Sequence, residues 1–135
     1  MRFADTNVLL YSISRDPAEQ EKARRANEIL ADRDLALSVQ VLQEFYVQAT
    51  RASRPDAIGH GQAVRLIESF RRFEVQDLTS GIMMAALGAC KKFQLSYWDA
   101  AIIEACRAMG CDHVLSEDLN DGQNYGGVRV TNPFR

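Results

Sequence analysis

The sequence has 135 residues, the length of one ordinary domain, and its 47% hydrophobic and 25% charged residues are typical of a globular protein. A formal net charge of −2 argues against binding nucleic acid through bulk positive charge, although an acidic site could offset basic residues elsewhere in the sum. Three cysteines without a Cys-x-x-Cys pair and two distant histidines argue against a disulfide framework and a zinc site.

No segment has the features of an export signal or a membrane span. Residues 1–5 include charged side chains where a signal peptide needs an apolar run. The longest uncharged stretch, residues 78–90, is shorter than the roughly 20 residues that cross a bilayer. We therefore expect a soluble, cytoplasmic protein.

Strands and helices are predicted to alternate along the chain. A strand over residues 2–4 leads into an Asp-Thr-Asn sequence and an apolar run, and Asp16-Pro17 then indicates a helix start. The predicted strands cover residues 2–4, 35–38, 74–78, 113–116 and 128–131, and the predicted helices cover about 16–31, 39–51, 55–73, 80–93 and 97–109. Because such alternation is typical of βαβ units, we expect an α/β protein whose parallel sheet is covered on both faces. Ligands of these sheets bind beyond the carboxyl ends of the strands.

Two aspartates directly follow predicted strands and should lie on that edge of the sheet. Asp5 comes after the first strand and Asp118 after the fourth. Each also has an ordinary structural explanation, because Asp5 could cap the next helix and Asp118 could belong to a turn with Asp121-Gly122.

Two helices contribute one further carboxylate each. At helical spacing Asp99 shares a face with Ile102 and Ile103, so it should point toward the core. The alternative is that Asp99 only completes a capping box with Ser96. Glu44, in the second predicted helix, could be functional or simply solvated. Four carboxylates around one edge, with no histidine or cysteine nearby, would favour a hard cation such as Mg²⁺ or Mn²⁺.

Four segments form a recognisable pattern along the whole chain. They are Asp5-Thr6-Asn7-Val8-Leu9-Leu10, the helical Glu44, Tyr97-Trp98-Asp99-Ala100 and Leu115-Ser116-Glu117-Asp118-Leu119. In this order they resemble the signature of the PIN-domain family, and in particular the VapC-type toxins of bacterial toxin–antitoxin pairs. The resemblance implies one PIN domain over residues 1–135, with a parallel five-stranded sheet in the order 3-2-1-4-5 flanked by helices.

The resemblance also implies an activity and a set of site residues. The activity is Mg²⁺- or Mn²⁺-dependent cleavage of RNA by an endoribonuclease. The residues that match the acidic quartet of the family are Asp5, Glu44, Asp99 and Asp118. Asp121 matches a metal-site position that is acidic in some members only, and Ser116 matches a small polar residue that supports the site.

Such chemistry needs residues that bind the metal and a residue that acts on water. A metal ion lowers the pKa of its bound water, and a second ion would stabilise the leaving oxygen. We expect Asp5, Asp99 and Asp118 to be metal ligands and Glu44 to orient or deprotonate the attacking water. The sequence leaves open whether one ion or two ions bind.

The implied partners are RNA, a cognate antitoxin that blocks the site, and a second copy in a homodimer. Tyr97 and Trp98 could stack on bases or could be core anchors. An antitoxin would need an apolar docking surface, for which Leu30, Tyr46 and Val47 are candidates, and it could insert an arginine into the acidic pocket. Candidate phosphate contacts are Lys22, Arg24, Arg25, Arg51, Arg54, Arg71, Arg72, Lys91 and Lys92.

Three other interpretations compete with a nuclease. A receiver-like phosphoacceptor domain would need an acidic pair after the first strand, where this chain has only Asp5. A calcium loop would need alternate ligand spacing and a terminal glutamate, which residues 118–122 lack. A catalytically idle PIN-like protein-interaction module is the remaining alternative, and an RNA-cleavage assay with and without EDTA would distinguish it from a nuclease.

Overall fold

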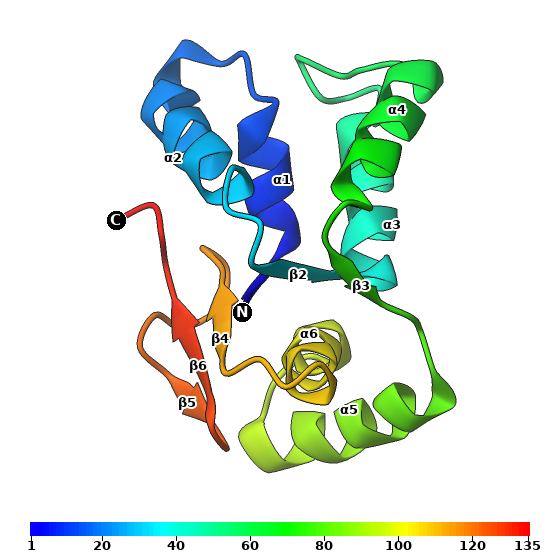
Figure 1. Cartoon of the computed structure of the whole chain (residues 1–135), viewed down its shortest axis with the longest axis vertical. Helices are drawn as coiled ribbons and strands as arrows, with labels where there is room; N and C mark the ends of the chain where they lie inside the picture. The colour runs from blue at the N-terminus through cyan, green and yellow to red at the C-terminus, as the bar shows by residue number, and fades with distance from the viewer.

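The computed structural model describes all 135 residues, and strands and helices alternate along most of the chain (Figure 1). A single 3-10 turn at Pro17–Glu19 precedes the second helix. The strands are β1 (Arg2–Ala4), β2 (Leu35–Ser38), β3 (Glu74–Gln76), β4 (His113–Leu115), β5 (Asn124–Tyr125) and β6 (Val128–Thr131). The helices are α1 (Thr6–Ser12), α2 (Gln20–Leu30), α3 (Val39–Ala49), α4 (His60–Phe70), α5 (Ser80–Phe93) and α6 (Tyr97–Ala108).

The sheet has the order β3-β2-β1-β4-β6-β5. The first five strands in this order are parallel to their neighbours, and β5 is antiparallel to β6. The predicted order of the five parallel strands is therefore confirmed, but the predicted total of five is wrong. The additional strand forms because Gly126 and Gly127 both have positive φ angles, 61° and 100°, which permit a tight two-residue hairpin turn.

Two predicted helices begin later than expected. The helix predicted from residue 55 begins at His60, and the helix predicted from residue 16 is a 3-10 turn followed by α2. Asp56 explains the first difference, because one of its carboxylate oxygens accepts from the backbone N–H of Arg15 at 3.1 Å and the other from the Arg54 guanidinium at 2.9 Å. These contacts hold residues 54–56 in a turn.

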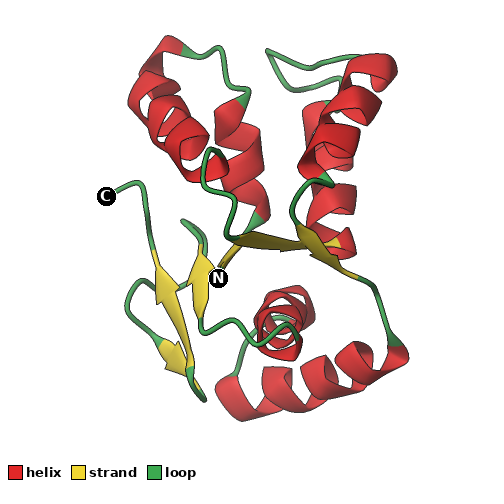
Figure 2. Cartoon of the chain, viewed as in Figure 1, coloured by secondary structure: helices red, strands yellow, loops and turns green.

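Helices cover both faces of the sheet, with α1 to α4 on one side and α5 with α6 on the other (Figure 2). The central strands are buried, as Phe3, Leu37 and Val114 show. On one face, Phe45 of α3 packs edge to face against Phe70 of α4, with ring centroids 5.2 Å apart. No helix is both long and apolar enough to span a membrane.

The parallel arrangement brings two loop starts together at one edge of the sheet. Immediately after β1, the backbone N–H of Asp5 donates to the carbonyl of Leu115 at 3.0 Å. Immediately after β4, the N–H of Ser116 donates to the carbonyl of Thr131 at 3.0 Å. The ladder thus continues for one residue past each strand and fixes where the side chains of Asp5 and Ser116 lie.

Candidate functional site

Asp5 is the buried carboxylate at this edge, with 7% of its surface exposed. Its Oδ1 accepts from the N–H of Thr6 at 2.8 Å. Asp5 therefore caps α1, as one of its two predicted roles required. Its Oδ2 accepts from the hydroxyl of Ser116 at 2.8 Å, a contact that capping does not need. Asp5 is therefore both a helix cap and an oriented carboxylate between β1 and β4.

The environment of Asp5 favours its protonated form. Burial is the largest influence and raises its pKa from 3.8 to about 6, and the negative charges of Glu44 and Asp118 act in the same direction. The hydrogen bonds from Ser116 and Thr6 oppose this shift without cancelling it. Glu44 of α3 and Asp118 of the loop after β4 thus lie near enough to Asp5 for their charges to act on it.

Ser116 organises the loop that carries Asp118. While its hydroxyl donates to Asp5, its oxygen accepts from the backbone N–H of Asp118 at 3.1 Å and of Leu119 at 3.3 Å. The Asn7 amide lies 3.3 Å from Oδ2 of Asp118, to which it donates. Asp118 is exposed, and this network turns its carboxylate toward the start of α1.

Glu44 is held by hydrogen bonds and is only half-buried, so it is no freely solvated side chain. Its Oε2 accepts from the hydroxyl of Thr6 at 2.7 Å, and its Oε1 accepts from the amide of Gln40 at 2.9 Å. Thr6 is the neighbour of Asp5, so α3 and α1 are joined at the carboxylates.

Asp99 and Asp121 are less closely joined to this group. Asp99 lies half-buried in the first turn of α6, where its N–H donates to Ser96, and its charge adds to burial in raising the pKa of Tyr125. The Gln40 amide also donates to the carbonyl of Trp98 at 3.2 Å, which connects the start of α6 to Glu44. Asp121 pairs with Arg135 at 3.3 Å instead.

A second network clamps the same loop from the other side. The phenol of Tyr11 donates to Glu117 at 2.6 Å and the ammonium of Lys22 donates to it at 2.8 Å. Although burial raises the pKa of Glu117, these two hydrogen bonds lower it below its ordinary value. Sequence reasoning missed Thr6, Gln40 and this clamp, and only the position of Thr6 inside the Asp-Thr-Asn segment could have indicated one of them.

The profile of the PIN domain matches residues 2–120 of this sequence. The chain belongs to the PIN-domain family. No curated protein gives a significant sequence match, but solved structures are similar to this PIN domain.

One similar structure is VapC20 of Mycobacterium tuberculosis, described as a sarcin-ricin loop cleaving toxin, with a TM-score of 0.68 and 19% identity over 87% of this chain and 92% of that one. A toxin–antitoxin complex from Klebsiella pneumoniae has a TM-score of 0.71 and 18% identity over 98% of both chains. DNA-bound VapBC from Salmonella typhimurium has a TM-score of 0.64 and 18% identity over 96% of this chain and 95% of that one. The structural neighbours of this PIN domain thus include VapC toxins and toxin–antitoxin complexes.

The raised pKa of Asp5 predicts that its charge destabilises the metal-free protein. Between pH 4 and 6 the folded state binds more protons at Asp5 than the unfolded state, so stability falls as pH rises through this window. Replacing Asp5 with Asn removes that cost, which is up to about 3 kcal/mol for a shift of this size. In EDTA, Asp5→Asn should melt several degrees above the wild type at pH 7.5 and at a similar temperature near pH 4.

Thermal unfolding followed by circular dichroism at several pH values would measure this difference. A variant that melts below the wild type at every pH would show that the hydrogen bonds of Asp5 outweigh the cost of burying its charge.

Proposed function

We propose that this PIN domain is a Mg²⁺- or Mn²⁺-dependent endoribonuclease that acts as the toxin of a type II toxin–antitoxin system. The observation that carries the proposal is the burial of Asp5 beside two other negative side chains at the carboxyl edge of a parallel sheet. A buried carboxylate beside other negative charges is costly unless a cation neutralises it. The arrangement therefore suits a site whose ligand is positively charged.

The donor set fits a hard cation, because it consists of carboxylate, hydroxyl and amide oxygens. No three carboxylate, imidazole or thiol groups are near enough to form a metal site by themselves. Mg²⁺ is commonly held by one or two carboxylates together with water and substrate phosphate, so this protein requires no complete cage. When bound, such an ion would lower the pKa of water and neutralise charge on the phosphodiester.

The contacts support roles for three of the proposed site residues, which are Asp5, Asp118 and Glu44. Asp5 and Asp118 would be the primary ligands, since Ser116 orients the first and positions the backbone of the second. Asp99 would complete the ligand set from α6. Glu44 would hold the nucleophilic water, a position that its hydrogen bonds from Thr6 and Gln40 define. Asp121 would become a ligand only after losing its pair with Arg135.

The RNA would contact basic residues that make no ion pair or side-chain hydrogen bond within the protein. Lys22 pairs with Glu117 at 2.8 Å and Arg54 pairs with Asp56 at 2.9 Å, so both are engaged within the fold. The candidates without an ion pair or a side-chain hydrogen bond are Arg51, Arg71, Lys91 and Lys92. These are the residues that we propose for phosphate contacts.

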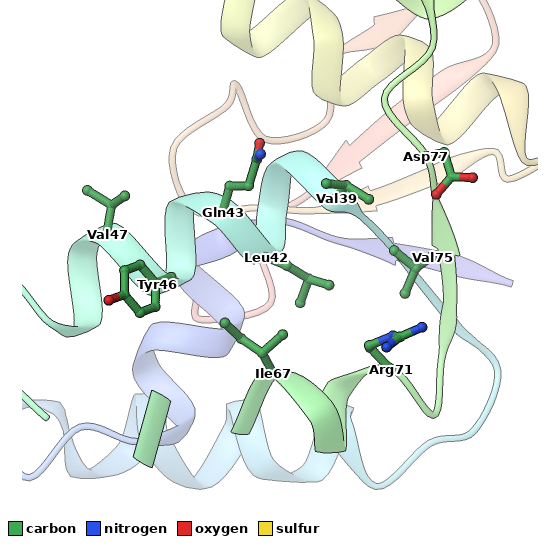
Figure 3. Close-up of a pocket in the computed structure, with 9 residues that line it drawn as sticks. All are labelled: Val39, Leu42, Gln43, Tyr46, Val47, Ile67, Arg71, Val75 and Asp77. Atoms are coloured by element: carbon green, nitrogen blue, oxygen red, sulfur yellow. The ribbon is translucent and has the colours of Figure 1, made fainter. Parts of the chain in front are cut away.

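An antitoxin would dock in an apolar groove between α3, α4 and β3. The groove has a volume of about 760 Å³, and Figure 3 shows its side chains. Its lining residues are Val39, Leu42, Gln43, Tyr46, Val47, Ile67, Arg71, Val75 and Asp77. Tyr46 and Val47, two of the residues predicted to contact an antitoxin, line this groove. Leu30 is only 7% exposed and packs in the core, so the prediction that it contacts an antitoxin is wrong.

The expected antitoxin segment is an amphipathic helix whose apolar face fills this groove. Gln43 and Val47 also border a smaller hollow beside Glu44, so a basic side chain from such a segment could reach the carboxylates. Homodimerisation would use a different surface, the exposed apolar residues around α5, which are Leu78, Met83, Met84 and Leu87.

The nuclease proposal predicts loss of RNA cleavage in Asp5→Asn and in Glu44→Gln. Each variant removes a charge while keeping the side-chain shape, and the rate should fall about 100-fold or more. Asp112→Asn is the matched control, because Asp112 is an exposed aspartate at the amino end of β4 and should leave the rate unchanged. Cleavage of labelled RNA with Mn²⁺ or with EDTA would measure the effect, and undiminished activity in EDTA would contradict the metal dependence.

Inactivity of the wild type toward all RNA would favour the idle interaction module.

The groove predicts how a partner is captured. Ile67→Ala should weaken binding of the antitoxin about tenfold, because the antitoxin loses apolar contacts with the Ile67 side chain in the groove. Val64→Ala is the control, as Val64 lies half-buried on the same helix but outside the groove. The measurement is affinity for the product of the adjacent reading frame after co-expression. Equal weakening by both variants would assign the effect to helix stability and contradict docking in this groove.

A further inference from the structure

Trp98 is the only tryptophan of the chain, and 64% of its surface is exposed. It is therefore not a core anchor, although its ring packs edge to face on Tyr97 with centroids 5.0 Å apart. Val47, which lines a hollow together with Trp98, is also exposed, so two apolar side chains are open to a ligand there.

Trp98 borders a hollow that Glu44 also lines. This Trp98 hollow has a volume of about 300 Å³ and is lined by Gln40, Gln43, Glu44, Val47, Gln48 and Trp98. The buried Gln40 connects its two sides, because its amide donates both to Oε1 of Glu44 and to the carbonyl of Trp98. The backbone that carries the indole is thus tied to Glu44 through Gln40.

The chemistry of the hollow suits a flat, neutral, hydrogen-bonding group. Gln43 and Gln48 make no side-chain hydrogen bonds within the protein, so their amides can donate and accept toward a ligand. No basic residue lines the hollow, which argues against a phosphate, and Glu44 is its one charged residue. The volume is at the lower end of the roughly 300–1,000 Å³ of small-molecule sites.

We infer that the Trp98 hollow binds one unpaired nucleobase of single-stranded RNA, next to the phosphodiester that the carboxylates address. Trp98 stacks on the base, and the amides of Gln43 and Gln48 bond to its edge. This inference rests on the proposed ribonuclease function, because it takes the substrate of that function as its ligand. It also predicts a preference of the protein for single-stranded segments, since a paired base has neither face nor edge available.

The single tryptophan permits a test that needs no cleavage. Asp5→Asn protein in EDTA is titrated with a single-stranded RNA oligomer and, separately, with an abasic oligomer of the same length and charge. The RNA should quench the tryptophan fluorescence to saturation, and the abasic oligomer should not. In anisotropy measurements with labelled RNA, Trp98→Ala should weaken binding about tenfold or more, whereas Trp98→Phe should retain most of the affinity.

Matched glutamines separate the edge contacts from helix stability. Gln48→Ala should weaken RNA binding, and Gln62→Ala, an exposed glutamine of α4 away from the hollow, should not. Equal quenching by RNA and abasic oligomer, or unchanged affinity in Trp98→Ala, would overturn the inference. A blue shift of the emission with protein concentration alone would also overturn it, because a second copy would then cover the indole. Absence of cleavage with intact quenching would instead refute the proposed function and leave the base site standing.

Discussion

The hydrogen bond between Ser116 and Asp5 is the contact on which the candidate site depends. It joins the residues that follow β1 and β4, and it orients a carboxylate that burial would otherwise leave without a partner on that side. The same hydroxyl accepts from two backbone N–H groups of the next loop, so it also positions Asp118. One small side chain therefore couples the sheet to both acidic residues.

The electrostatic consequence is a fold that keeps a buried carboxylate beside two other negative side chains. Asp5, Glu44 and Asp118 come from three different elements, and each is restrained by neutral donors rather than by a base. Neutral donors orient a carboxylate without cancelling its charge, which leaves the site negative and able to attract a cation. The clamp of Tyr11 and Lys22 on Glu117 keeps the ammonium of Lys22 paired outside this group.

Much of the fold could be predicted because the signals are local. Asp5 and Ser116 follow apolar segments with strand character, and parallel pairing requires such residues to share an edge. The β5 hairpin was missed because the strand has only two residues, too few for an alternating pattern, and only its glycine pair indicated a turn. Side-chain direction was harder to predict for Trp98, which faces outward, because tertiary packing decides whether an aromatic side chain at a helix start is buried. The partners of Glu44 are 38 positions and four positions away, and the place of Thr6 in the Asp-Thr-Asn segment indicated only that it lies beside Asp5.

The central claim is that the acidic edge of the sheet is a cation site, and calorimetric titration with Mn²⁺ tests it most directly. Protein freed of metal with EDTA and then dialysed would be compared with Asp5→Asn and Asp112→Asn. The account predicts that the wild type and Asp112→Asn bind Mn²⁺ at millimolar concentration or below, and that Asp5→Asn binds at least about tenfold more weakly. Absence of binding by the wild type at millimolar Mn²⁺, or equal binding by all three proteins, would contradict it.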